Sequence, residues 1–394
     1  MLASASYLPS GLRLRKSTGT CRRRNTCKGR YVATVRADVG VRQKVGAALG
    51  LGVLNRVCQK LCLSSELSSH VLVVSLFLSV CYTLVYSATL ALNVQRGNVP
   101  LSDLRSVPLA LLLVTGFGEA LGSVLGTFGA ANLGTSSAAA SLLPLLNQSL
   151  LIWQLMWSSL LLRTQFTANN YVGVLLIALG IAIVTMSSSD ASMVGVISST
   201  SSTALIACIV STCPPALAAT VKQKAFATMR DRLGGRDASL FLVNTFGSIV
   251  QVLATITFLP LTALSRGVPV SELPSAFSSG FAVLFGAVGP YEPLLALLYG
   301  TVNLIFNVSA LLLLRSTSAA IASVSLSLTV PLSAAAFSFL PLPYLSKRSL
   351  GTSFLLGSVV VLSGVAIYND LIRVPPGWRN LMPLPGKGKA EKDE

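Results

Sequence analysis

Only a few charged side chains interrupt the long apolar stretches of this 394-residue chain, and these residues are the ones that could bind a solute. Arg56 and Lys60 are one helical turn apart, so they present two positive charges on one face, which suits an anionic or zwitterionic solute. Asn55 lies beside them. The sequence leaves open whether these cations face a cavity, extend to an interface or pair with an acid.

Glu119, in the segment GFGEALGSVLG, is the only carboxylate well inside an apolar stretch. Burial favours the protonated form of a carboxyl group, so Glu119 is the expected proton-coupling residue if transport uses a proton gradient. The alternative is a permanent ion pair with Arg56. Glycines on both sides of Glu119 would let another helix approach closely.

Side-chain amides form the remaining candidates for binding. Asn147 and Gln148 follow Pro144, which bends its helix, and Asn303 and Asn307 share one helical face. We expect these amides to line a solute path, with hydrogen bonding between helices as the alternative. Together with Asn55 and Arg56 they are the predicted substrate-binding residues. No metal or cofactor site is expected, because no His/Cys/Asp ligand pattern is present.

The composition requires that these residues be positioned by membrane helices. Apolar residues make up 52% of the chain and charged residues 11%, which is typical of an integral membrane protein. About 20 apolar residues are needed to cross the hydrocarbon as a helix. Ten stretches qualify: 44–63, 69–92, 107–128, 136–162, 168–187, 194–219, 239–264, 291–314, 318–342 and 349–372.

Loop charge supports this even number of spans. With both termini on one side, sixteen basic residues lie on that side and three on the other, as the positive-inside rule predicts. The densest basic cluster falls in an expected loop over 220–238. Spans 1–6 then occupy 38–219 and spans 7–10 occupy 239–373, followed by a disordered tail over 374–394.

An internal similarity indicates a duplication. Residues 136–187 and 317–369 share a small-residue segment, an apolar run and a helix with two glycines, GVLLIALG and GSVVVLSG. Equivalent helices of the two copies are five spans apart, so the copies face opposite ways. We therefore predict an all-α membrane protein of ten helices in two inverted five-helix repeats, spans 1–5 (44–187) and spans 6–10 (194–373).

The first 37 residues have the composition of an organellar transit peptide. They hold nine Lys or Arg, several hydroxyl residues and no acid. Without them the net charge falls from +17 to +8, so nucleic acid is not an expected partner. The expected partners are a small-molecule solute and membrane lipid. The sequence does not determine the oligomeric state, and it allows a monomer.

At these polar residues the chain resembles the chloroquine-resistance-transporter-like family of the drug/metabolite transporter superfamily. The matching segments are VLNRVCQKL (53–61), GFGEALG (116–122), LLPLLNQSLLIWQL (142–155), VNLIFNVSALLLL (302–314) and SLTVPLSAAAFSFLPLPYL (327–345). The resemblance implies two inverted halves around a central cavity lined by the candidate residues, and plant members that carry thiol peptides across the plastid envelope. Family members often have cysteines before span eight, which residues 265–290 lack.

The expected function is secondary transport of small anionic thiol peptides, glutathione and γ-glutamylcysteine, across the inner plastid envelope, with both termini in the stroma. A carrier of another metabolite class, such as a sugar phosphate, amino acid or drug-like cation, is the first alternative. A membrane enzyme is the second, but the spans hold no carboxylate pair and the chain has one histidine. A primary pump is excluded within this chain because no Gly-x-x-x-x-Gly-Lys-Ser/Thr loop is present.

Overall fold

The computed structural model describes residues 39–62, 65–132, 146–147, 149–186, 202–339 and 352–368. The expected transit peptide and tail, and Gln148, lie outside these ranges. Every regular element in the described ranges is helical and no strand forms there, as predicted. The elements are α1 Val39–Cys62, η1 Glu66–His70, α2 Val71–Gln95, α3 Leu101–Arg105, α4 Leu109–Asn132, α6 Ser149–Leu162, α7 Ala168–Met186, α9 Ser202–Ser211, α10 Cys213–Arg232, α11 Leu240–Ser265, η2 Val270–Glu272, α12 Leu273–Leu284, α13 Tyr291–Ser316, α14 Ala319–Ser327, α15 Thr329–Phe339 and α16 Thr352–Tyr368.

Five helical segments in the described part are long and apolar enough to cross a membrane: α2, α4, α11, α13 and the run of α9 into α10. Shorter apolar helices form in α6, α7, α14 with α15, and α16. The expected first span, α1, belongs to neither set, since four basic residues interrupt it. The chain is thus an all-helical protein with five candidate spans among its described residues, and ten spans stay a prediction.

The helix of the sixth expected span extends further than the sequence indicates. We expected a span over 194–219 and a basic loop over 220–238, whereas α10 continues to Arg232. Lys222 therefore lies on a helix and not in a loop. The helix ends at the glycine pair 234–235, where both residues have positive φ, a conformation that glycine adopts without steric strain.

The two glycine pairs of the internal similarity pack against each other in α7 and α16. A Cβ added to Gly173 would lie 2.8 Å from the carbonyl oxygen of Gly364, and one added to Gly180 would lie 2.7 Å from that of Gly357. The two helices therefore run antiparallel. Gly173 corresponds to Gly357 in the other copy, and Gly180 corresponds to Gly364. Replacing both members of the Gly173–Gly364 contact by their counterparts gives the Gly357–Gly180 contact, the relation that an inverted repeat would produce.

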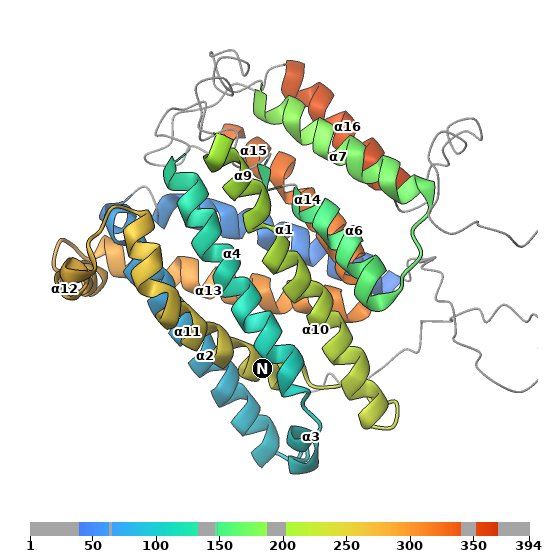
Figure 1. The fold of residues 1–394 in the computed structure, drawn as a ribbon, viewed down its shortest axis with the longest axis horizontal. Coiled ribbons are helices and arrows are strands. Elements are labelled where there is room, and N and C mark those ends of the chain that lie inside the picture. The colour runs from blue at the N-terminus through green and yellow to red at the C-terminus, as the bar shows by residue number, and fades with distance from the viewer. Residues whose placement is uncertain are drawn as a thin grey trace, which may run out of the picture.

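Other helix pairs follow the same relation. The contact of α1 with α13 joins the first and eighth expected spans, and it corresponds to the contact of α10 with α4, the sixth and third. In the same way, the contact of α6 with α10 corresponds to the contact of α14 and α15 with α1. Helices α2 and α11, the second and seventh expected spans, pack on each other as α7 and α16 do. In Figure 1 these last two pairs lie at opposite edges of the molecule, with the other helices between them.

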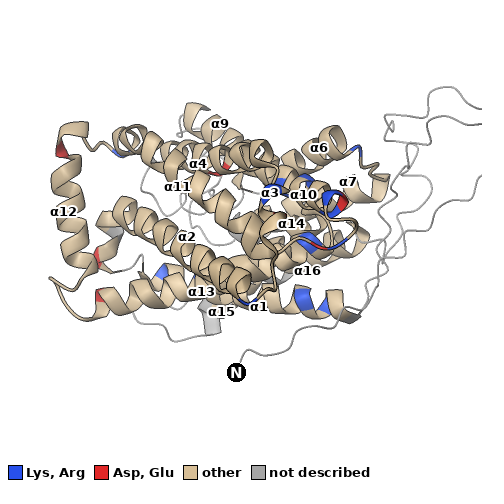
Figure 2. Ribbon diagram, turned by 90° about the horizontal axis from the view of Figure 1, so that it is seen from below, with Lys and Arg blue, Asp and Glu red and all other residues tan. Residues whose placement is uncertain are grey.

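Basic residues tie several connections together at one end of the molecule. Arg236, before α11, forms an ion pair with Asp103 of α3 at 3.3 Å, and Arg315, at the end of α13, donates to the carbonyl of Ala238 at 2.9 Å. Figure 2 shows Lys and Arg concentrated around α3 and α10, while α2 and α11 carry none. Three connections that the charge count assigned to one side of the membrane thus share one end.

Candidate functional site

Glu119 of α4 forms an ion pair with Lys222 of α10. Glu119 Oε1 and Lys222 Nζ are 2.5 Å apart, and the two side chains are 27% and 18% exposed, respectively. The sequence suggested Arg56 as an ion-pair partner for Glu119, so the structure corrects that alternative. Lys222 was missed because its helix was taken to end at residue 219, although the first glycine stop signal comes only at residue 234.

The carboxylate lies on the inner face of α4. Phe117 and Leu121, which are 47% and 38% exposed, are each two residues from Glu119 and therefore project from the opposite side of the helix. Ser123, one turn beyond Glu119 on its own face, is also exposed. Glu119 therefore lies on the side of α4 that is opposite its exposed apolar side chains.

Two tyrosines of α2 connect this ion pair to α13. Tyr86 lies close enough to Glu119 to interact electrostatically with it. Tyr82, one turn earlier, lies close to both Tyr86 and Tyr299 of α13. The tyrosine pair therefore bridges the space between the ion pair and the asparagines of α13.

The asparagines of α13 form a short hydrogen-bonded ladder. Asn303 Nδ2 donates to the hydroxyl of Tyr299 at 3.2 Å, and Asn307 Nδ2 donates to Asn303 Oδ1. Asn307 is exposed, so its amide oxygen is accessible. The structure thus places the predicted Asn303 and Asn307 in one group with the predicted Glu119. We call this group the polar band: Lys222, Glu119, Tyr86, Tyr82, Tyr299, Asn303 and Asn307.

Arg56 of α1 lies at the level of this band. Gly52 packs on Phe306 of α13, while Cys62 lies close to Tyr299, so α1 and α13 run antiparallel and Arg56 is level with Asn303. The guanidinium is half-buried, and no carboxylate within the described ranges forms an ion pair with it.

Asn55, the neighbour of Arg56, is buried. Its Oδ1 atom has no hydrogen-bond partner among the described residues. A buried amide oxygen without a partner is costly, so a donor supplied by a ligand would stabilise it. Asn55 and Arg56 together offer an acceptor and a cation, which keeps both as candidate binding residues.

The amides expected in the fourth span lie in different environments. Asn147 is exposed in the turn before α6, and no described contact joins its side chain to the polar band. Gln154, one helix turn into α6, is instead buried, and its Nε2 donates to Thr220 Oγ1 of α10 at 2.6 Å. Gln154 therefore joins α6 to α10 by an interhelical hydrogen bond, the use that was considered as the alternative for the nearby amides Asn147 and Gln148.

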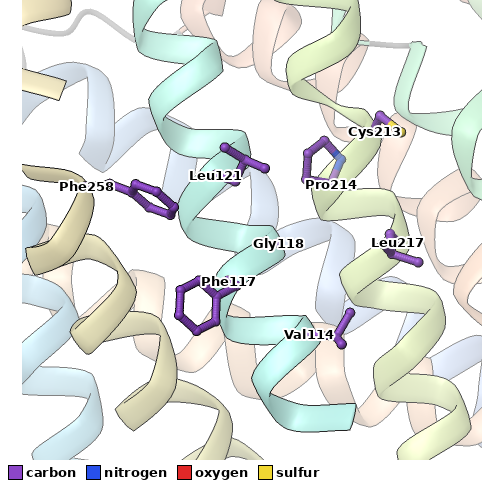
Figure 3. Close-up of a pocket in the computed structure, with 8 residues that line it drawn as sticks. All are labelled: Val114, Phe117, Gly118, Leu121, Cys213, Pro214, Leu217 and Phe258. Carbon is purple, nitrogen blue, oxygen red and sulfur yellow. The ribbon is translucent and has the colours of Figure 1, made fainter. Parts of the chain in front are cut away.

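The pocket drawn in Figure 3 lies outside the polar band. It is a groove of about 370 Å³ between α4, α10 and α11. The lining is apolar apart from Cys213: Val114, Phe117, Gly118, Leu121, Pro214, Leu217 and Phe258. Phe117 and Phe258 meet edge to face at 6.4 Å. An apolar groove with exposed aromatic residues suits lipid contact and gives nothing for an anion to bind.

The arrangement can bind a charged solute. In the part of the chain that the structure describes, no three His, Cys, Asp or Glu residues come together as a metal site would require. The polar band and Arg56 supply two cations, a carboxylate, amides and phenols to one region between apolar helices. Such groups inside a membrane protein indicate a solute or ion path.

A family model described as CRT-like, chloroquine-resistance transporter-like, matches residues 45–289. The chain belongs to the CRT-like family. Among its relatives, Protein CLT2, chloroplastic, of Arabidopsis thaliana is 32% identical over 82% of this chain and 74% of its own. Protein CLT1 and Protein CLT3, both chloroplastic and from the same plant, are 30% and 29% identical over 82% and 86% of this chain, and 71% and 74% of their own.

These matches confirm the family resemblance read from the sequence. The chloroplastic relatives and the apolar helices identify this CRT-like chain as a plastid membrane protein of a transporter family. A solved structure that matches 85% of this chain and 98% of its own length has 12% identity to it and a TM-score of 0.45.

Proposed function

We propose that this CRT-like protein is a secondary transporter of the inner plastid envelope that moves small anionic thiol peptides, glutathione and γ-glutamylcysteine, by alternating access. Both termini face the stroma, and Glu119 couples transport to protons. The observation that carries the proposal is Arg56, a half-buried cation at the level of Asn303 with no acidic partner in the described ranges.

A cation held away from water is stable when an anion compensates it. A peptide carboxylate would compensate Arg56 and form charge-assisted hydrogen bonds with the guanidinium. The peptide groups of the same solute would meet donors and acceptors on Asn55, Asn303 and Asn307. Basic and amide groups on α1 and α13 thus fit a short anionic peptide better than an apolar or cationic solute.

The proposed inverted repeats supply the motion. In transporters of this kind, two related halves rock against each other around a fixed site. The symmetric packing of α7 on α16 and of α2 on α11 supports two such halves. Concentration of Lys and Arg at the end that holds α3 and the α10–α11 connection supports placing that end in the stroma.

Uptake of glutathione and γ-glutamylcysteine should be measured in liposomes that hold the chain without residues 1–37, with and without an imposed pH gradient. We expect saturable uptake that an inward proton gradient accelerates. A sugar phosphate, an amino acid and a drug-like cation serve as comparison solutes. Saturable uptake of one of these, with none of either peptide, would refute the thiol-peptide assignment; gradient-independent peptide uptake would remove the coupling role of Glu119.

A further inference from the structure

We propose that Lys222 binds an anionic group of the transported solute, and that Glu119 occupies Lys222 until a proton on Glu119 releases it. The inference rests on the proposed function and identifies a second cation at the same site. It also specifies how proton coupling and solute binding are linked, through competition of two carboxylates for one ammonium group.

The ion pair is placed where a solute could reach it. Glu119 and Lys222 project from two different helices, α4 and α10, and both side chains retain partial exposure on the inner side of the bundle. Gly118 lets α4 approach Pro214 of α10, so the lysine reaches the carboxylate along its extended stem. A long flexible cation next to accessible space is able to exchange one carboxylate for another.

The groups around Glu119 leave Lys222 as its main electrostatic partner. Helix α2 contributes Tyr86, while α11 and α9 carry no Asp, Glu, Lys, Arg or His. Cys213 of α10 lines the outer groove beside Gly118, away from the inner face. Loss of the negative charge on Glu119 would therefore leave Lys222 without a carboxylate partner among the described residues.

The charge balance links one proton to one solute carboxylate. With Glu119 ionised, the pair is neutral, and an incoming carboxylate would lie beside a like charge. A proton from the water on the side of entry forms an O–H bond on Glu119 and removes that charge. Lys222 then pairs with the solute carboxylate, and the site is neutral again. Reversal of both events on the other side releases the solute and the proton.

The predicted repeat gives Lys222 a counterpart. Helices α1 and α10 belong to the first and sixth expected spans, which correspond to each other, and α1 packs on α13 as α10 packs on α4. Arg56 of the first repeat is level with Asn303 of the second, and Lys222 of the second repeat meets Glu119 of the first. Each repeat thus presents one cation to an oxygen-bearing partner from the other, an arrangement that suits a solute with two carboxylates, as glutathione has.

The test compares glutathione uptake by the chain without residues 1–37 as wild type, as E119Q, as K222Q and as the double variant E119Q/K222Q, at several pH values around neutrality. We expect the wild-type KM to fall as pH falls, and the E119Q KM to be independent of pH. K222Q and the double variant should have a KM about tenfold to a hundredfold higher, because a charge-assisted hydrogen bond is lost. K224Q, an exposed lysine on the same helix, is the matched control.

The double variant guards against misfolding, because it leaves no unpaired charge inside the bundle. If the ion pair only holds α4 to α10, the folded double variant will show the wild-type KM and pH profile, and that result would overturn the inference. Wild-type uptake with an unchanged KM in folded K222Q would overturn it as well. Absence of peptide uptake by the wild type would instead refute the proposed function and this inference together.

Discussion

Arg56 and Lys222 are cations on corresponding expected spans, yet their surroundings differ. Lys222 is neutralised by Glu119 at 2.5 Å, whereas Arg56 is level with the uncharged Asn303. A free guanidinium also offers two parallel donors to a carboxylate, which an ammonium group does not. We infer that Arg56 contributes more to resting affinity for the solute, and that Lys222 contributes only once its own acid is protonated.

Replacing Arg56 with Gln should raise the KM for glutathione by about tenfold or more, since a charge-assisted hydrogen bond is removed. Expression and thermal stability should change little, because no ion pair within the described ranges is broken. Uptake kinetics and a melting curve in detergent measure the two effects. Lys60→Gln, one turn away and exposed, controls for loss of charge on the same helix. Equal losses of uptake and stability in R56Q would indicate a structural cation.

Gln154 should behave in the opposite way. Its side chain is 1% exposed and bonds Thr220 across the α6–α10 contact, so a solute has no access to it. A double-mutant cycle with Gln154→Leu and Thr220→Val should give a coupling energy of roughly 0.6 to 1.7 kcal/mol in unfolding experiments in detergent. The KM should stay unchanged. A raised KM at full stability would place Gln154 on the solute path.

At the scale of whole helices, the sequence predicts that a helix exists better than it predicts where the helix ends or which helices it packs against. Uncharged apolar runs such as α2 and α11 are recognisable from composition, because their polar flanks mark both ends. Helix α10 was cut short because Lys222 looks like a loop residue when only charge is considered. The partner of Glu119 depends on which helix packs against α4. That choice depends on the shapes of the two helix surfaces, for example on the fit of Gly122 against Pro215. Sequence periodicity does not encode such a fit.

The glycines of α7 and α16 were recognised by spacing alone, and their contact makes a sharp prediction. In Gly180→Ala the new Cβ would lie 2.6 Å from the backbone nitrogen of Val361, and backbone atoms are unable to move aside, so the helices must separate. We expect a loss of about 1 to 3 kcal/mol in unfolding free energy, with a similar loss for Gly364→Ala.

The matched control is Gly247→Ala in α11. Gly247 is also a buried helical glycine, but a Cβ there would meet no atom within 4 Å. The substitution should be neutral or stabilise the protein by up to about 1 kcal/mol, as Gly to Ala does in a helix. If Gly180→Ala and Gly247→Ala had equal effects on the unfolding curve, close packing of α7 on α16 would be refuted.

For the whole molecule, the departure from symmetry is as informative as the symmetry. Helix α4 packs along much of α11, whereas the corresponding pair, α13 and α2, meets at few places such as Gly300 and Leu78. Two inverted repeats with identical conformations would make these contacts equal. In the proposed alternating-access cycle, this structure would be one of two states, the one in which α4 is closed on α11 while α13 and α2 are apart.

The second state should exchange the two arrangements. We expect α13 to close on α2 while α11 moves away from α4. Spin labels at Leu84 and Ile305, both exposed on α2 and α13, should then approach each other when solute and protons are added. Labels at Leu121 and Phe258, which line the groove between α4 and α11, should separate. Pulsed distance measurements on the two label pairs would detect both changes.

Distances that shift in the same direction, or not at all, would contradict exchange between the repeats, since rocking of one half against the other must open one pair as it closes its counterpart.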